Sequence, residues 1–356
     1  MDLHLCLVAT ELFAWGRYGG FGSATRLLGS SLADRGVDVS CVVPLGVGQC
    51  ARDELDGMRV LGFPLSRYPF TGGMYREARA DVYHSQDPSY GTGLALGAVP
   101  RAVHVATCQN PKTSQDWKAV EGFYLLRRRV YNLLVEKRVR SWVGWLDAVY
   151  CQAKYIIQKA RELYDLTTDP AFMPNPVSVP SGLPKKPDEP TVCFLGRFDA
   201  EKVPEAFFEL AERFPDVRFV AGGAAHDPRR DRVLRRRYSH VRNLELPGFV
   251  SGGEKECLLT DAWILVNTSV SECLPVSFLE ASAHGCAILS PHDPDGFASR
   301  SGCRVIDGDL DGGLKRLLEE DEWRAKGTAG YKYVSETHEL GKVTDMHLAE
   351  YRKLLG

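Results

Sequence analysis

The sequence predicts an α/β protein made of two doubly wound domains with parallel sheets. Short apolar runs rich in β-branched residues alternate with amphipathic helical patterns along the chain, as in parallel sheets covered by helices. The alternation is interrupted where six prolines occur within the eighteen residues Met173–Pro190, which excludes a helix or a central strand there. A length of 356 residues also favours two domains over one.

Apolar, β-rich runs between turn residues predict the strands of the first half: Leu3–Ala9, Val37–Val43, Met58–Phe63, Asp81–His84, His104–Cys108 and Ala148–Cys151. Apolar positions at helical spacing predict helices over Ala24–Arg35 and over Trp117–Trp145. This alternation indicates an N-terminal domain over residues 1–173, followed by a proline-rich linker over 174–190.

The alternation restarts after the linker with further strand candidates: Val192–Leu195, Arg218–Ala221, Asn243–Leu246, Ala262–Asn267 and Ala287–Ser290. Amphipathic patterns predict a helix over Pro204–Phe214 and a last helix over 336–355. We therefore expect a C-terminal domain over 191–335, and a final segment, 336–356, that packs back toward the N-terminal domain. Two such domains would face each other across a cleft, where the carboxyl ends of the strands bind ligands.

The composition is that of an ordinary globular protein, with 44% hydrophobic and 25% charged residues and a net charge of −2. This charge gives no indication of nucleic-acid binding. The ten cysteines are scattered without a Cys-x-x-Cys pair, which indicates a reduced compartment rather than disulfides or a zinc site. The N-terminal residues lack the features of a signal peptide and no apolar run is long enough to span a membrane, so we expect a cytoplasmic protein.

Glu272 and Glu280 bracket the first turns of a further predicted helix. Pro275 suits its first helical position and Gly285 suits its end. A helix N-terminus attracts phosphate, because its N–H groups are unpaired and carry a partial positive charge. One carboxylate on each side of that terminus could hold hydroxyl groups on either side of a diphosphate, as a nucleotide-sugar requires. The structural alternative is one glutamate in a surface loop and one unrelated glutamate on a helix.

Residues Gly19–Thr25 follow the first predicted strand and open the helix after it. Gly20 and Gly22 would let the backbone approach a phosphate or a sugar closely. They do not form a dinucleotide fingerprint, since Thr25 stands where the third glycine belongs and Pro44 ends the second strand without an acidic residue. This disfavours an oxidoreductase.

Arg197 and Lys202 follow the first strand after the linker, where two cations could neutralise a diphosphate leaving group. The alternative is that both are surface cations near Asp199 and Glu201. The next strand runs into Gly222-Gly223, which gives a second backbone loop at a strand end.

The second domain contains a series of motifs in this order: Gly196-Arg-Phe-x-x-x-Lys202, Ala221-Gly-Gly223, Pro247-Gly-Phe249, and Glu272-x7-Glu280 continued by Glu-Ala-x-Ala-x-Gly to Gly285. In order and spacing they resemble the retaining GT-B glycosyltransferases, in particular the large fourth family, over essentially the whole second domain. The first domain agrees more loosely, through Gly19–Gly22 and Leu32–Val39. The resemblance implies a GT-B fold and a retaining, metal-independent transfer of a hexose from a UDP- or GDP-sugar to a hydroxyl acceptor.

The resemblance also implies roles for individual residues. Arg197 and Lys202 would bind the donor diphosphate. Glu280 would hold the ribose, and Glu272 the hydroxyls of the transferred sugar. Backbone groups would complete the donor site at Gly20, Gly22, Gly196, Gly222, Gly223, Cys273, Leu274, Pro275 and Val276. We expect no cofactor besides the nucleotide-sugar and no metal, because the two cations and the helix dipole supply the charge stabilisation.

The first domain departs from the family at Gln109. Many relatives have a histidine near the reacting sugar in a Thr-x-His pattern, where this chain has Thr107-Cys-Gln109. Glutamine cannot act as a base but can hydrogen-bond a sugar hydroxyl, so Gln109 stays among the catalytic candidates. A retaining front-side transfer does not need a protein base, because the departing phosphate can take the proton. On the acceptor side we place Gln109, Asn110 and His84, with a structural role as the alternative for His84.

Other charged stretches are open to more than one interpretation. Cations and aromatics over 117–145 suit an anionic membrane surface or a lipid-linked acceptor, and a solvated helix packed on the first domain is the alternative. The basic stretch 229–237 predicts an exposed helix rather than a nucleic-acid site. Asp293-Pro-Asp295 imitates a metal-binding Asp-x-Asp, but it lies on a proline turn and is interpreted as a loop.

The sequence thus predicts a glycosyltransferase for glycan, polysaccharide or glycolipid synthesis, cytoplasmic or peripheral at the inner membrane face. Its partners would be a nucleotide-sugar and a glycan, lipid-linked or small-molecule acceptor, the acceptor being bound by loops such as 68–75 and 109–117. Nucleic acid is not expected as a partner. Two alternatives stay open: a catalytically silent relative that only binds a sugar-nucleotide or a partner protein, and a GT-B-fold sugar-nucleotide epimerase.

Overall fold

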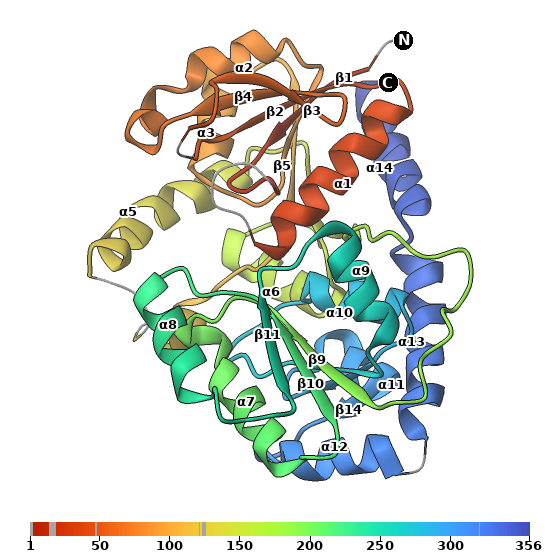
Figure 1. The fold of residues 1–356 in the computed structure, drawn as a ribbon. Coiled ribbons are helices and arrows are strands. Elements are labelled where there is room, and N and C mark those ends of the chain that lie inside the picture. The colour runs from red at the N-terminus through yellow and green to blue at the C-terminus, as the bar shows by residue number, and fades with distance from the viewer. Residues whose placement is uncertain (1–2, 14–18, 47, 121, 123–125, 320) are drawn as a thin grey trace. The chain divides into compact units, whose positions relative to one another are not determined.

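The structure is a computed structural model that describes residues 3–13, 19–46, 48–120, 122, 126–319 and 321–356, of which the side chains at 114, 119–120 and 126–134 are not described. The chain divides into two compact units. The first unit comprises Met1–Val177 and His338–Gly356, and the second comprises Ser178–Thr337. Both ends of the chain therefore belong to the first unit (Figure 1).

The first unit contains an eight-stranded sheet in the order β3-β4-β2-β1-β5-β6-β7-β8. The strands are β1 (His4–Val8), β2 (Asp38–Pro44), β3 (Arg52–Leu55), β4 (Met58–Phe63), β5 (Val82–Ser85), β6 (Val103–Cys108), β7 (Ala148–Cys151) and β8 (Ala171–Phe172). The β3–β4 pairing is antiparallel, and the other pairings are parallel. The predicted parallel sheet is therefore confirmed, with an antiparallel strand at one edge.

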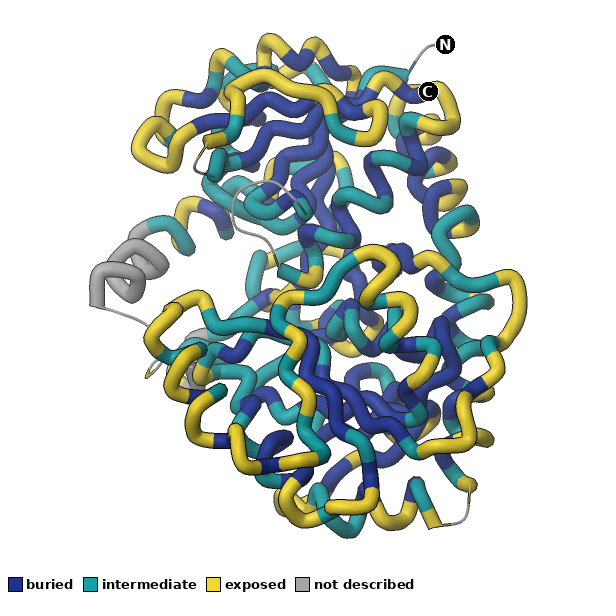
Figure 2. The backbone as a smooth tube through the Cα atoms, in the orientation of Figure 1, coloured by how far each residue is buried: buried dark blue, intermediate teal, exposed yellow. Residues whose placement is uncertain are grey.

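Alternate residues of the central strand β1 face opposite sides of this sheet. Leu5 and Leu7 pack into one hydrophobic cluster, whereas Cys6 and Val8 pack into another. Strand β1 is a continuous apolar run because both of its faces are covered. Figure 2 shows the buried strands as dark blue stretches of the backbone.

The helices of the first unit are α1 (Gly20–Asp34), α2 (Gly72–Ala78), α3 (Tyr90–Ala98), α4 (Ser114–Val120), α5 (Leu126–Val143), α6 (Ile157–Tyr164) and α14 (Leu340–Leu355), with 3-10 turns at Leu65–Phe70 and Lys154–Ile156. The last helix, α14, lies beside α1 (Figure 1). Its residues Leu348 and Tyr351 are buried in the same cluster as Leu5 and Leu7. The C-terminal helix is thus part of the core of the first unit.

The second unit contains a six-stranded parallel sheet in the order β11-β10-β9-β12-β13-β14. Its strands are β9 (Thr191–Leu195), β10 (Arg218–Gly222), β11 (Leu244–Gly248), β12 (Ile264–Val266), β13 (Ala287–Ser290) and β14 (Gly302–Arg304). Its helices are α7 (Pro204–Arg213), α8 (Pro228–Arg237), α9 (Gly252–Asp261), α10 (Val276–Ala283), α11 (Phe297–Ser301), α12 (Leu310–Glu319) and α13 (Glu322–Thr337), with 3-10 turns at Ala200–Lys202 and Pro294–Gly296.

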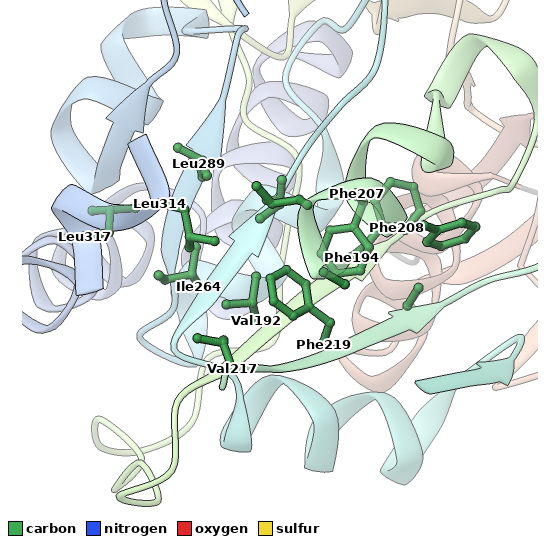
Figure 3. Close-up of a cluster of buried hydrophobic side chains, with 14 of the residues drawn as sticks. Val192, Phe194, Phe207, Phe208, Val217, Phe219, Ile264, Leu289, Leu314 and Leu317 are labelled. Carbon is green, nitrogen blue, oxygen red and sulfur yellow. The ribbon is translucent and has the colours of Figure 1, made fainter. Parts of the chain in front are cut away.

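Aromatic side chains fill much of the space between α7 and this sheet (Figure 3). Phe207 of α7 lies with its ring centroid 5.6 Å from Phe194 of β9 and 5.3 Å from Phe219 of β10. Such tilted and edge-on contacts add to the hydrophobic gain of burying each ring. This packing fixes α7, and with it the loop that joins β9 to α7, against the centre of the sheet.

Several predicted elements need correction. The helix expected over Ala24–Arg35 begins at Gly20, so the glycines form its first turn. The helix expected over 336–355 begins at Leu340, because α13 ends just before it at Thr337. The helix expected over Trp117–Trp145 is found as α4 and α5, with residues 121 and 123–125 outside the described part of the chain.

The sequence pattern also misses strands β3, β8 and β14, of which β8 has only two residues. Strand β3 is mostly exposed and charged, which is typical of an edge strand rather than of a buried one. In β14, a Cβ on Gly302 would lie 1.9 Å from the carbonyl oxygen of Ile288. This close approach to β13 requires glycine, which weakens the strand signal.

Candidate functional site

The residues expected to bind a donor follow the central strands of the second sheet. Strands β10 and β11 lie on one side of β9, and β12 to β14 lie on the other. The strand order therefore reverses between β9 and β12, and open α/β sheets bind ligands at such a switch point. Arg197 and Lys202 follow β9, and Glu272 lies in the loop after β12.

Lys202 and Glu272 meet at this switch point. The Nζ of Lys202 lies 2.5 Å from Oε1 of Glu272, with 22% and 11% of the two side chains exposed. The same oxygen accepts hydrogen bonds from Ser269 Oγ at 2.6 Å and Asn267 Nδ2 at 3.2 Å. Burial acts to raise the pKa of Glu272, but Lys202 and these hydrogen bonds outweigh it and hold the pKa below its ordinary value. The site thus keeps an ionised carboxylate beside an ammonium group.

The turn that carries Lys202 is strained at the next residue. Val203 has a φ of +44°, in the left-handed region that β-branched residues rarely adopt. The hydroxyl of Thr268 donates to the carbonyl oxygens of Lys202 and Val203, at 2.8 and 2.9 Å. The loop after β12 therefore holds both the backbone and the side chain of Lys202.

Arg197 is held by residues of its own loop. Its guanidinium lies 2.9 Å from Asp199 Oδ2 and 2.5 Å from Glu201 Oε1, and Nδ1 of His226 lies 3.2 Å away. Arg197 is therefore paired with the two neighbouring acids, and its contact with a donor diphosphate stays a prediction. A diphosphate would compete with two carboxylates for Arg197 but with only one, Glu272, for Lys202. Of the two cations, Lys202 is therefore the better placed to bind a diphosphate.

Glu280 is paired with a lysine that the motifs do not include. The Nζ of Lys255, on α9, lies 2.6 Å from Oε1 of Glu280, on α10, and both side chains are largely shielded, with 26% and 14% exposed. Sequence reasoning missed Lys255 because nothing around it on α9 indicates a partner twenty-five residues further along the chain. The pair adds a second lysine–glutamate contact to the predicted donor site.

The helix of Glu280 differs by one residue from the prediction. Pro275 is its N-cap, and the first helical residue is Val276. Gly285 ends the helix as predicted, with a φ of +75° and its N–H donating to the carbonyl of Ser282 at 2.9 Å. Since the side chain of Leu274 is buried, a ligand at this helix start would meet backbone groups.

Close packing explains the two glycines at the end of β10. A Cβ on Gly223 would lie 1.9 Å from the carbonyl oxygen of Gly196, and a Cβ on Gly222 would lie 2.6 Å from Val250. The N–H of Gly196 donates to the carbonyl of Gly222 at 3.2 Å. The two loops thus touch through their main chains at the carboxyl edge of the sheet.

A carboxylate caps the start of α1, where the sequence predicted a phosphate. Glu11 Oε2 accepts a hydrogen bond from the N–H of Gly19 at 2.6 Å. Gly22 is buried in the first turn, and Gly20 is exposed. A phosphate at this helix N-terminus would therefore compete with Glu11, which sequence reasoning did not single out.

Gln109 belongs to a buried amide network. Its Nε2 donates to Asn175 Oδ1 at 3.0 Å, and Nδ2 of Asn175 donates back to its Oε1 at 2.8 Å. Gln152 Nε2 donates to the carbonyl oxygen of Gln109 at 2.9 Å, and only 6% of Gln109 is exposed. Both ends of the Gln109 side-chain amide therefore bind Asn175, and a contact between Gln109 and a substrate stays a prediction.

His84 also has a structural role. It is fully buried, with Nδ1 2.6 Å from Tyr351 Oη and Nε2 2.8 Å from Thr107 Oγ1. Burial, and secondly the nearby His347, lower the pKa of His84 well below its ordinary value. These contacts agree with the structural alternative for His84, and its place on the acceptor side stays a prediction.

Asn110, the third acceptor-side candidate, is exposed and lines a cavity of about 250 Å³ in the first unit. Tyr68 and Trp117, from the two loops expected to bind the acceptor, line the same cavity. So does Asp87, which sequence reasoning missed. Its signal was available, because an acidic residue three positions beyond the predicted strand Asp81–His84 lies at the carboxyl edge of the sheet.

Two further charged segments agree with their interpretation as an exposed helix (229–237) and as a loop (293–295). Helix α8 carries the basic stretch on a largely exposed surface, with Arg235 paired to Asp231 at 2.6 Å. Asp293 lies in a turn, where its Oδ1 accepts the N–H of Ser299 at 3.0 Å. Much of the basic stretch 117–145 lies outside the described side chains. Among the described residues, no helix is long and apolar enough to cross a membrane.

Residues 180–299 match the family described as "Glycosyl transferases group 1". These residues include Lys202, Glu272 and Glu280. This segment of the second unit belongs to the glycosyl transferases of group 1. The family predicted from the four motifs is thereby confirmed, whereas the roles of its individual residues stay predictions.

Solved structures of glycosyltransferases share the fold of the whole chain. Sucrose-phosphate synthase from Thermosynechococcus elongatus matches with a TM-score of 0.76 and 16% identity, over 99% of this chain and 98% of that one. HepE from Anabaena, in complex with UDP and glucose, matches with a TM-score of 0.73 and 13% identity, over 99% of both chains. The pneumococcal O-GlcNAc transferase GtfA, in complex with UDP and GlcNAc, matches with a TM-score of 0.72 and 9% identity, over 99% of both chains.

At these identities the likeness establishes the fold and no more. The predicted GT-B fold is confirmed by these matches together with the two parallel sheets. No curated protein matches the chain by sequence.

Proposed function

We propose that this group 1 glycosyl transferase is a retaining enzyme that transfers a hexose from a UDP- or GDP-sugar to a hydroxyl acceptor, in glycan, polysaccharide or glycolipid synthesis. The observation that carries the proposal is the Lys202–Glu272 pair at the switch point of the unit that matches the family. Structures of the same fold that hold UDP with glucose or with GlcNAc support a uridine nucleotide as the first donor to test.

The donor diphosphate would lie at Lys202 and at the N-terminus of α10. The ammonium group would stabilise the charge that develops on the leaving phosphate, and the helix N-terminus would add N–H groups and its dipole. Glu272, beside Lys202, would accept hydrogen bonds from hydroxyls of the transferred sugar. Glu280 would accept them from the ribose, with Lys255 orienting this carboxylate.

The transfer would proceed on the face from which the diphosphate leaves. The bond between the anomeric carbon and the phosphate oxygen breaks, the bond to the acceptor oxygen forms, and the leaving phosphate takes the acceptor proton. This scheme uses no protein base, which agrees with the buried positions of Gln109 and His84. It assigns the charge stabilisation to Lys202 and to α10.

A catalytically silent relative that only binds a sugar-nucleotide is the second candidate. Two observations favour it: Arg197 is already neutralised by Asp199 and Glu201, and Gln109 is enclosed by Asn175. Such a protein would bind the donor without releasing the nucleoside diphosphate.

Product analysis by NMR separates the two candidates. The protein is incubated with UDP-glucose, UDP-GlcNAc or GDP-mannose and a set of hydroxyl acceptors, and anomeric protons and released nucleoside diphosphate are followed. We expect release with an α-linked product, and a loss of about 100-fold in Glu272→Gln. Glu319→Gln, on the exposed side of α12, serves as the control without effect. Donor binding without release would establish the silent relative, and a β-linked product would contradict retention.

A further inference from the structure

The cavity of the first unit lies at that sheet's own switch point. Strands β2 to β4 lie on one side of β1, and β5 to β8 lie on the other. Thr10 follows β1, Asp87 and Ser89 follow β5, and Asn110 follows β6, and all four line the cavity of about 250 Å³. Three adjacent strands therefore deliver polar groups to one hollow at the carboxyl edge, where open α/β sheets bind ligands.

Aromatic rings form much of the cavity wall. Tyr68, Tyr90, Trp117 and Tyr164 line it. Tyr68 and Tyr90 meet edge to face with their ring centroids 5.6 Å apart, and the hydroxyl of Tyr68 accepts the N–H of Gly91 at 3.0 Å. Such contacts fix the rings in place, so the cavity offers rigid apolar surfaces beside its polar groups.

Acidic and basic side chains around the cavity are equal in number. Asp87 and Glu136 contribute two carboxylates, and Lys112 and Arg140 contribute two cations. Arg140 is paired with Glu136 one helical turn away, and Lys112 lies 4.9 Å from the ring centre of Trp117. A binding site for an anionic head group would carry an excess of cations, which this cavity does not have.

Asp87 is the acidic group closest to the strand ends in this cavity. Its Oδ1 accepts the N–H of Gln109 at 2.9 Å. Burial raises the pKa of Asp87 to about 7, with Glu11 adding to the rise, while backbone N–H groups of Gln109 and Asn110 and the charge of Lys112 lower it. The other titratable or charged groups that line the cavity with it are Lys112, Glu136, Arg140, Tyr68, Tyr90 and Tyr164. Its ability to accept hydrogen bonds therefore changes near neutral pH.

We propose that this cavity is the acceptor subsite and binds one neutral pyranose ring, with Asp87 accepting hydrogen bonds from its hydroxyls and Trp117 packing against its C–H face. The inference rests on the proposed glycosyltransferase function. At about 250 Å³ the cavity is smaller than the 300–1,000 Å³ typical of sites for drug-sized ligands, so it fits a single ring or the end of a glycan chain. The mixture of rings, balanced charges and strand-end polar groups suits a neutral sugar better than a hydrocarbon chain or an anionic lipid head group.

Direct sugar binding tests the subsite independently of turnover. Saturation-transfer NMR titrations of the whole protein use p-nitrophenyl glucoside, galactoside and mannoside as neutral hexosides. A p-nitrophenyl glucuronide represents an anionic sugar, and a phosphatidylglycerol bicelle represents an anionic lipid surface. We expect at least one neutral hexoside to bind more tightly than the glucuronide, and its Kd to rise about tenfold or more in Asp87→Asn and in Trp117→Ala. Asp53→Asn, an exposed aspartate of β3, is the matched control and should bind as the wild type does.

The pH dependence separates a binding role of Asp87 from a structural one. As Asp87 ionises, it becomes a stronger acceptor, so the Kd of the hexoside should fall severalfold between pH 6 and pH 8 in the wild type and stay constant in Asp87→Asn. Equal Kd values in wild type and Asp87→Asn, tighter binding of the glucuronide or the bicelle, or no hexoside binding would overturn the proposal. Because no donor is used, these results do not depend on whether the proposed transfer occurs.

Discussion

Lys202 and Glu272 depend on each other electrostatically, which makes Lys202 the residue whose loss should be most informative. Lys202→Met removes the cation that would stabilise the leaving diphosphate and also raises the pKa of Glu272, since burial then acts without its strongest opponent. We expect kcat to fall about 100-fold or more, with partial recovery in Lys202→Arg. Initial-rate kinetics check this, and a change confined to the acceptor KM would contradict the assignment.

Val203 offers a test of whether backbone strain serves the site. Val203→Gly relieves a left-handed conformation that costs about 1–3 kcal/mol in a non-glycine residue, while it loosens the turn that positions Lys202. We expect an unchanged or higher Tm together with a severalfold lower kcat. A lower Tm in calorimetry, or full activity, would show that strain at Val203 does not serve to position Lys202.

Lys255 should act through Glu280 as a positioning residue. In Lys255→Met the carboxylate of Glu280 loses a partner at 2.6 Å, so its orientation toward a ribose becomes less defined. We expect the donor KM to rise about threefold to tenfold with a smaller change in kcat, because the ribose contact is made equally before and during the reaction. Lys255→Arg should restore most of the affinity for the donor. An unchanged donor KM in Lys255→Met would show that Lys255 has no part in donor binding.

At the scale of elements, α14 ties the end of the chain to the first sheet through buried histidines. Tyr351 contacts His84 at 2.6 Å and His347 at 3.3 Å, and burial lowers the pKa of His347 to about 3. These histidines titrate near pH 6.5 in the unfolded chain but stay neutral in the folded protein. Their contribution to the free energy of unfolding is therefore fully present above that pH and is lost as the pH falls toward 3.

The slope of that loss is a second prediction for α14. Each buried neutral histidine lowers the free energy of unfolding by about 1.4 kcal/mol for every pH unit below the pKa that it has in the unfolded chain. His347→Gln should therefore reduce the slope by about that amount between pH 6 and pH 5, in urea unfolding curves measured at several pH values. If the slope were the same in wild type and variant, His347 would have to be protonated in the folded protein.

The carboxyl edges of the two sheets were predictable because local patterns define them. Apolar runs such as Met58–Phe63 and Ala148–Cys151 match the observed strands, and the glutamates and Lys202 stand where the motifs place them. What the sequence could not indicate depends on distant partners. Gln109 is enclosed by Asn175, sixty-six residues away in sequence.

The same limit applies to the first turn of α1 and to its surroundings. Glycine is a poor helix former, so local propensity places the start of α1 after Gly22 instead of at Gly20. The capping of this turn by Glu11 depends on the loop before it, for which no spacing rule exists. Predictions from the sequence were therefore better for strand ends than for the side chains that neutralise one another there.

At the scale of the whole molecule, we propose that the second unit binds a nucleoside-diphosphate sugar through Glu280 and its neighbours. A thermal-shift screen of the full chain against UDP, GDP, ADP, CMP and their sugar conjugates tests this most directly, with Glu280→Gln beside the exposed control Glu319→Gln. We expect one nucleoside diphosphate to raise the Tm of the wild type and of the control, and the rise to shrink in Glu280→Gln by the loss of about 1.5–3 kcal/mol from a charge-assisted hydrogen bond. An equal rise in Glu280→Gln, or no rise with any nucleotide, would contradict the account.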